Sequence, residues 1–173
     1  MKKNYFVKAT MMLVVLLTAT LFASCSKEEI DDPKTPFEYK APCLNWHCTI
    51  DEVRTYMKSI KGYTEDKDVE KKSDGKLCYH FVGSNKSYSY TFDNKGLVEC
   101  SYDDMNGTAN FDKLKLSVTA THEVKEWKQE QTMSGVEWWT TTLKGRKTSI
   151  AIGKSENYGG YMYVNFQYDE FDW

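Results

Sequence analysis

Proline and glycine are scarce in this chain of 173 residues, which has three prolines and ten glycines. Their scarcity excludes a collagen-like or low-complexity chain. Positive charge is not in excess either, since 23 Lys and Arg face 25 Asp and Glu, for a formal charge of −2. A nucleic-acid-binding protein that depends on a basic surface is therefore not expected. Apolar and aromatic residues are plentiful instead, at 40 % and 14 %, which is typical of a folded, strand-rich domain.

Motifs of catalysis and cofactor binding are also missing. The chain has no Walker A motif, no Rossmann fingerprint, no G-x-S-x-G and no H-E-x-x-H. Its three histidines, His47, His80 and His122, have no nucleophile or acid at a recognisable spacing. A metal set built on Cys43, His47 and Cys48 lacks a fourth ligand at a zinc-site spacing. We therefore expect no catalytic residue, no cofactor and no metal, and a protein that is not an enzyme.

A single long hydrophobic run lies near the N-terminus. The first 24 residues contain three lysines and no acidic residue, and an apolar run extends from Met11 to Ala23, interrupted by two threonines. A membrane-spanning helix needs roughly 20 apolar residues, so this run is short for a span. A basic start followed by a short apolar run predicts a signal peptide over residues 1–24. The alternative is a single-pass membrane anchor.

The end of this run carries a recognisable pattern. Phe22-Ala23-Ser24-Cys25 resembles the lipobox of bacterial lipoproteins, in which small residues precede an acylated cysteine. The resemblance implies that Cys25 carries lipid chains such as palmitate, becomes the first residue of the mature chain and anchors it to a membrane. Several acyl chains together make such an anchor effectively permanent.

The residues after Cys25 indicate where the anchored protein resides. The stretch Ser26, Lys27, Glu28 and Glu29 resembles the export signal of Bacteroidetes lipoproteins, which implies the outer membrane and a position facing the cell exterior. The alternative is that this acidity belongs to an ordinary linker. All three prolines fall within residues 25–42, which predicts an extended, unpacked tether. Residues 43–173 then form a single folded domain.

The first half of this domain predicts one helix and three strands. Thr49 and Glu52 form a capping box at the start of a helix that ends near Gly62. Strands are expected at 77–82, 87–92 and 97–102, joined by tight turns and therefore antiparallel. Register arguments give these opposed pairs: Leu77 and Phe92, Tyr79 and Tyr90, Phe81 and Tyr88, Phe92 and Val98, Tyr90 and Cys100, Tyr88 and Tyr102.

The second half repeats this layout. A short helix is expected from Thr121 to about Gln131, followed by strands at 136–143, 147–152 and 161–168. The alternation from Leu114 to Ala120 favours a linking strand over a helix. These patterns predict pseudo-repeats of about 43–120 and 121–173, each an αβββ unit. The expected fold is α+β, one antiparallel sheet of six to eight strands with two helices on one face.

This tandem layout over roughly residues 43–170 is similar to that of small secreted lipoproteins of the beta-lactamase-inhibitor-like kind, and of Bacteroidetes surface lipoproteins of unknown function. The resemblance carries no catalytic motif, so it implies no site residue. Cys43 and Cys48 are candidates for a disulfide that would close a small loop before the first helix, since the expected compartment permits disulfides.

Aromatic residues are the remaining functional signal. Trp138 and Trp139 are adjacent in a predicted strand, so their side chains lie on opposite faces. If Trp139 is in the core, then Trp138, Thr140, Tyr161 and Tyr163 lie on the other face of the sheet. That face is predicted to bind a protein or glycan partner. We therefore expect a non-enzymatic surface lipoprotein that binds a macromolecule; the alternative is a structural or assembly accessory of the cell envelope.

Overall fold

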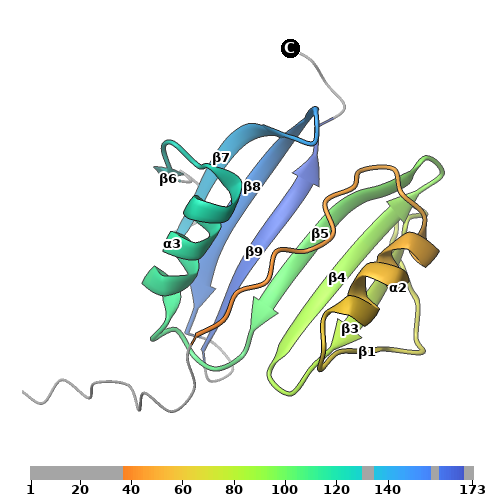
Figure 1. Cartoon of the computed structure of the whole chain (residues 1–173), viewed down its shortest axis with the longest axis horizontal. Helices are drawn as coiled ribbons and strands as arrows, with labels where there is room; N and C mark the ends of the chain where they lie inside the picture. The colour runs from red at the N-terminus through yellow and green to blue at the C-terminus, as the bar shows by residue number, and fades with distance from the viewer. Residues whose placement is uncertain (1–36, 130–134, 157–159, 170–173) are drawn as a thin grey trace, which may run out of the picture. The chain divides into compact units, whose positions relative to one another are not determined.

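The computed structural model describes residues 37–129, 135–156 and 160–169. In this part of the chain, two helices lie on one face of a nine-stranded sheet in which every strand pair is antiparallel (Figure 1). The predicted α+β class is confirmed. Six strands are long, and three two-residue strands at the sheet margins raise the number above the six to eight expected.

The first half of the domain follows its prediction closely. Helix α2 spans Ile50–Ser59, and Thr49 and Glu52 form both hydrogen bonds of the capping box. Strands β3 (Leu77–Val82), β4 (Lys86–Asp93) and β5 (Gly96–Asp104) pair in sequence. One predicted pair is wrong: a bulge at Thr91/Phe92 places Leu97, not Val98, opposite Phe92. The remaining pairs are as predicted.

Two short strands extend the edge beside β3. Strand β1 (Thr64–Glu65) pairs with one end of β3, and β2 (Glu70–Lys71) pairs with the other. Two residues carry no readable periodicity, so neither strand could be predicted from the sequence. Because β2 is antiparallel to β3, Glu70 lies directly opposite Cys78.

The second helix differs from its prediction. Helix α3 spans Phe111–His122, so the expected linking strand at 114–120 and the expected helix from Thr121 are both wrong. The buried positions are Leu114, Val118 and His122, which are four residues apart, whereas Leu116 is 70 % exposed. Residues four apart lie on one face of a helix. The alternating pattern in the sequence was misleading because it included Leu116, which is exposed. The second repeat therefore begins near residue 111 rather than 121.

The remaining strands join the two repeats into one sheet. Strand β6 (Lys128–Gln129) pairs with β7 (Val136–Leu143), which pairs with β8 (Arg146–Ser155). Strand β9 (Tyr161–Tyr168) pairs with both β8 and β5, so the last strand of each repeat meets at the centre of the sheet. The strand order is β1-β3-β4-β5-β9-β8-β7-β6, with β2 beside β3.

Residues 37–48 cross the helix-bearing face of the sheet between α2 and α3 (Figure 1). Pro42, Cys43 and Leu44 are buried in this segment. The Tyr88 hydroxyl donates to the Lys40 carbonyl at 2.8 Å, and Tyr56 donates to the carbonyl of Ala41. The predicted tether is therefore wrong for residues 37–42, which pack as part of the domain.

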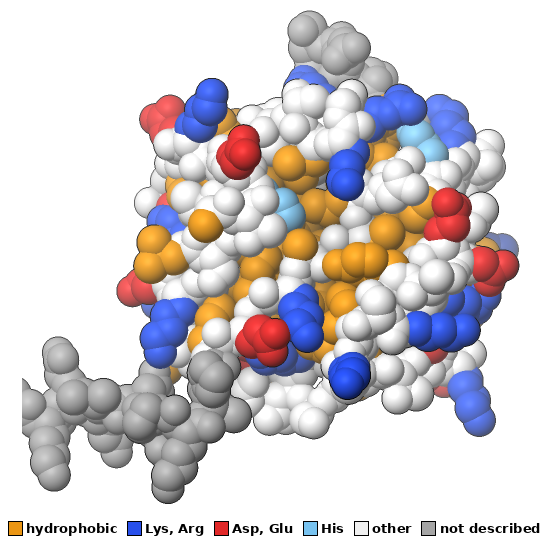
Figure 2. Space-filling model, viewed as in Figure 1, with side chains coloured by type: hydrophobic (Ala, Val, Ile, Leu, Met, Phe, Trp, Pro, Cys, Tyr) orange, Lys and Arg blue, Asp and Glu red, His pale blue; other side chains and the backbone are white. Residues whose placement is uncertain are grey.

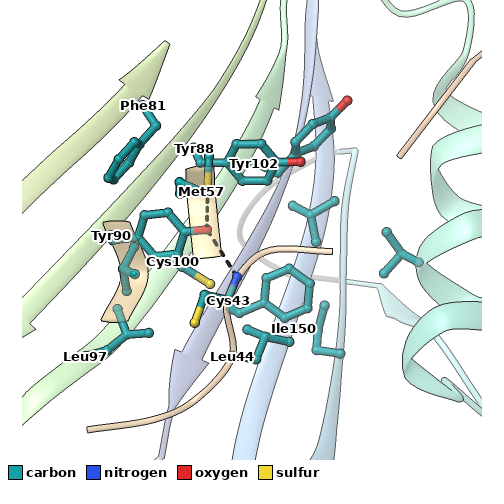
Figure 3. Close-up of a cluster of buried hydrophobic side chains, with 14 of the residues drawn as sticks. Cys43, Leu44, Met57, Phe81, Tyr88, Tyr90, Leu97, Cys100, Tyr102 and Ile150 are labelled. Atoms are coloured by element: carbon teal, nitrogen blue, oxygen red, sulfur yellow. Dashed lines mark hydrogen bonds between the residues drawn. The ribbon is translucent and has the colours of Figure 1, made fainter. Parts of the chain in front are cut away.

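The core lies between this face of the sheet and both helices, and Figure 3 shows part of it. The hydroxyl of Tyr90 accepts from the Cys43 backbone N–H at 3.1 Å and lies 3.3 Å from the sulfur of Met57. A strand, the N-terminal segment and a helix thus meet at one buried polar atom. No helix among the described residues is long and apolar enough to cross a membrane.

Candidate functional site

The sheet has one face turned away from both helices, which we call the open face. Side chains alternate along each strand, so the residues opposite the buried Tyr88, Tyr90 and Tyr102 point to this face. Cross-strand pairing aligns them in three rows. The open-face rows are Trp138, Ala151, Asn165, Ser101, Ser89, His80; then Val136, Gly153, Tyr163, Asp103, Ser87, Val82; and then Thr140, Ser149, Gln167, Glu99, Thr91, Cys78.

The four predicted binding residues do share the open face. Trp138 and Thr140 come from β7, and Tyr161 and Tyr163 come from β9. Strand β8 separates these strands, so the two groups stand about 10 Å apart across the sheet. Three aromatic rings therefore flank a shallow strip over β8.

A glycine sets the depth of this strip. A Cβ placed on Gly153 would lie 2.5 Å from the Cζ of Tyr163, so the tyrosine ring occupies the space above β8 that a side chain would fill. The ring of Tyr161 lies 6.0 Å from that of Tyr163, centroid to centroid. On the other side, the Lys128 ammonium lies 5.2 Å from the ring centroid of Trp138. Each ring is half-buried and held by a neighbour.

Polar side chains predominate in the middle of the open face, and the sequence analysis did not single them out. Asn165 donates to Glu99 at 2.8 Å, and Ser149 donates to Asp169 at 3.0 Å. Burial raises the pKa of the Asp103 carboxyl, while the hydroxyl of Ser101 opposes that shift. In the sequence these residues are only the polar half of an alternating pattern, which is equally typical of a solvated face.

Trp139, the neighbour of Trp138 on the other face of the sheet, packs against the core as the sequence analysis assumed, and its side chain is half-buried. It borders a shallow hollow beside the end of α3.

A second hollow, of about 450 Å³, lies on the helix-bearing face. Figure 2 views this face and shows hydrophobic side chains gathered between the two helices. The lining includes Pro42, Leu44, Tyr56, His122 and Leu143. Burial lowers the pKa of His122 to about 4 and raises that of Tyr56, so both are neutral near pH 7.

The four cysteines of the described residues are free thiols, so the candidate disulfide between Cys43 and Cys48 is not formed. Burial and the neighbouring Cys43 thiol raise the pKa of Cys48 to about 12. The lipidation residue Cys25 and the export residues 26–29 lie outside the described residues.

One cluster of the described residues could hold a metal ion. Glu70, Cys78 and His80 present ligand atoms that all lie within 4.8 Å of one another. The sequence analysis missed it because Glu70 is in β2, whose pairing with β3 has no signature in the sequence. In comparisons with known proteins, the chain matches no protein-family model, no curated protein and no solved structure.

Proposed function

We propose that this protein is a lipid-anchored, non-enzymatic protein of a bacterial outer membrane that binds a glycan through its open face. The observation that carries the proposal is the strip over β8, flanked by Trp138, Tyr161 and Tyr163. The lipid anchor and the outward-facing location rest on Cys25 and the residues after it, as argued from the sequence.

The chemistry of the open face favours a glycan over a protein. Protein interfaces usually have an apolar centre with a polar rim. Here the centre is polar, with Ser101, Asn165 and Ser149 beside the rings. Aromatic rings can stack on the C–H faces of sugars, while hydroxyl, amide and carboxylate groups bond their hydroxyls. A shallow face with one indole on β7 and two tyrosine rings on β9 suits an extended chain better than a small molecule, which prefers an enclosed pocket.

Affinity gel electrophoresis tests the proposal. The purified protein is run through gels that contain single soluble polysaccharides, and binding is measured as retardation. We expect at least one neutral polysaccharide to retard the protein. Trp138→Ala should weaken that retardation about tenfold or more, since truncating an aromatic at the centre of an interface typically costs roughly 2 kcal/mol or more.

Trp139→Ala is the matched control, because it removes the same side chain from the neighbouring position on the opposite face. It should bind as the wild type does, although it loses stability. If no polysaccharide retards the protein, or if both variants lose binding equally while remaining folded, the glycan proposal is wrong. Crosslinking of an envelope protein that depends on Trp138 would indicate a protein partner instead.

A further inference from the structure

A cluster of three metal-binding side chains lies at the opposite edge of the sheet from the aromatic strip. Cys78 and His80 are two residues apart in β3, so both point to the open face. Glu70 reaches them from β2, where it pairs directly with Cys78. Their ligand atoms lie within 4.8 Å of one another. These three residue types are the usual ligands of Zn²⁺.

The distance between the His80 and Glu70 ligand atoms fits two ligands of a tetrahedral ion better than a hydrogen-bonded ion pair. His80 Nε2 lies 3.4 Å from a carboxylate oxygen of Glu70. Charge-assisted hydrogen bonds of this type are usually about 2.7–2.9 Å long. By contrast, two ligands that are each about 2.1 Å from a tetrahedral metal stand about 3.4 Å apart.

The surroundings hold two of these ligands in position. His80 Nδ1 lies 2.9 Å from the hydroxyl of Ser89 on β4, which leaves Nε2 directed at Glu70. The Thr91 side chain hydrogen-bonds the thiol of Cys78. Partners of this kind orient metal ligands and tune their affinity in known sites.

We propose that Glu70, Cys78 and His80 form a Zn²⁺ site with three protein ligands. Thiolate, imidazole and carboxylate together select a borderline-soft ion, and exclude Ca²⁺ and Mg²⁺, which take only oxygen ligands. Glu70 is exposed and Cys78 is 2 % exposed. The ion therefore enters from the solvent side of β2, next to Glu70, and the buried thiol binds it from below. The fourth position faces solvent and takes a water molecule. The bound ion fixes β2 against β3 and is independent of glycan binding at the other edge.

The test uses the reduced full chain without an affinity tag. Zn²⁺ binding is measured by isothermal titration calorimetry, and Co²⁺ is added to detect the thiolate-to-cobalt charge-transfer band. We expect one Zn²⁺ per chain and a cobalt band in the wild type. The variants Glu70→Gln, Cys78→Ser and His80→Gln should each bind at least about tenfold more weakly, the lower end of the loss seen for supporting residues alone. Cys78→Ser should lose the band.

The double variant His47→Gln/Cys48→Ser is the matched control, because it removes another imidazole and another thiol of the domain. It should keep both the affinity and the band. Glu70→Gln alters an exposed side chain, so this variant should fold as the wild type does and a loss of binding cannot be ascribed to misfolding. The proposal is overturned if the wild type shows no band, or if all three ligand variants bind Zn²⁺ as tightly as the wild type. It is also overturned if the control loses the band, and none of these results bears on polysaccharide retardation.

Discussion

Burial decides the charge of the titratable side chains that line the helix-bearing face. His122 is 7 % exposed and contacts Tyr39, whose hydroxyl lies 3.1 Å from its Nε2. Its ring also packs against Phe166, at 4.8 Å between centroids. Desolvation lowers the pKa of His122 to about 4 and raises the pKa of Tyr39 well above its usual range. This pair is therefore an uncharged part of the core.

The low pKa of His122 predicts a pH-dependent loss of stability. Below about pH 6.5 the unfolded chain takes up a proton on this residue, whereas the folded chain does so only near pH 4. The unfolded state binds more protons in that window, so stability falls as the pH falls from about 6.5 to 4. A shift of this size is worth about 3 kcal/mol. Urea unfolding between pH 7 and pH 4 measures the slope.

His122→Gln serves as the comparison, because glutamine keeps a polar group near Tyr39 and does not titrate. Between pH 7 and pH 4 its free energy of unfolding should fall less than that of the wild type. The difference between the two proteins should be most of the roughly 3 kcal/mol attributed to His122. Identical slopes for the two proteins would show that folding does not shift the pKa of His122. Carboxyl groups contribute equally to both slopes and cancel in the difference.

Among the elements, α2 is fixed by local signals and α3 is not. Thr49 accepts from the Glu52 backbone N–H, and the Glu52 carboxylate accepts from the backbone N–H of Thr49 at 2.8 Å. The hydrogen bonds that the Thr49 backbone N–H and hydroxyl donate to this carboxylate lower the pKa of Glu52. Helix α3 has no such cap, since the side chain of Asn110 makes no capping bond. Its position depends on the burial of Leu114 and Val118 against the sheet.

The capping box of α2 gives a prediction at this scale. Thr49→Ala removes the side chain that caps the helix, and it should cost about 1 kcal/mol of unfolding free energy. The control is Thr55→Ala in the middle of the same helix, where the hydroxyl bonds the Asp51 carbonyl four residues earlier. That variant should be neutral or slightly stabilising, because alanine has the higher helix propensity. Equal losses in urea melts would contradict a specific capping role.

For the whole molecule, the segment before α2 is part of the folded domain. Residues 37–48 lie between the two helices, and His47 and Leu97 share a backbone hydrogen bond of 2.9 Å from the His47 N–H to the Leu97 carbonyl. Residues 37–42 therefore belong to the domain, although the sequence predicts a tether over 25–42.

Anchoring through Cys25 is testable directly. Cys25→Ala should abolish incorporation of labelled palmitate and leave the N-terminal 24 residues uncleaved, because the thiol that carries the lipid is gone. Cys43→Ser is the control, since it removes another cysteine while leaving the lipobox intact. Mass spectrometry of the N-terminus and labelling in whole cells measure both effects. Equal labelling of wild type and Cys25→Ala would reject the lipoprotein assignment.

Short-range chemistry explains which predictions succeeded. The register of β3 and β4 follows from one two-residue turn and strict alternation, because a slip of one residue would bring the buried Tyr88 and Tyr90 to the open face. The capping box fixed the start of α2 in the same way. The shared face of Trp138, Tyr161 and Tyr163 also follows from alternation, once the strands are correct.

Only the tertiary structure decided the features that depend on burial or on distant partners. Leu116 and Leu114 look alike in the sequence, and packing on the sheet alone makes one exposed and the other buried. The pairing of β5 with β9 joins segments about 60 residues apart, and no local signal encodes that contact. The same holds for Glu70, which approaches Cys78 and His80 through a strand of two residues. The sequence alone determined the α+β class and the alternating faces, because each rests on neighbours along the chain, and the targeting pattern at Cys25 stays a prediction.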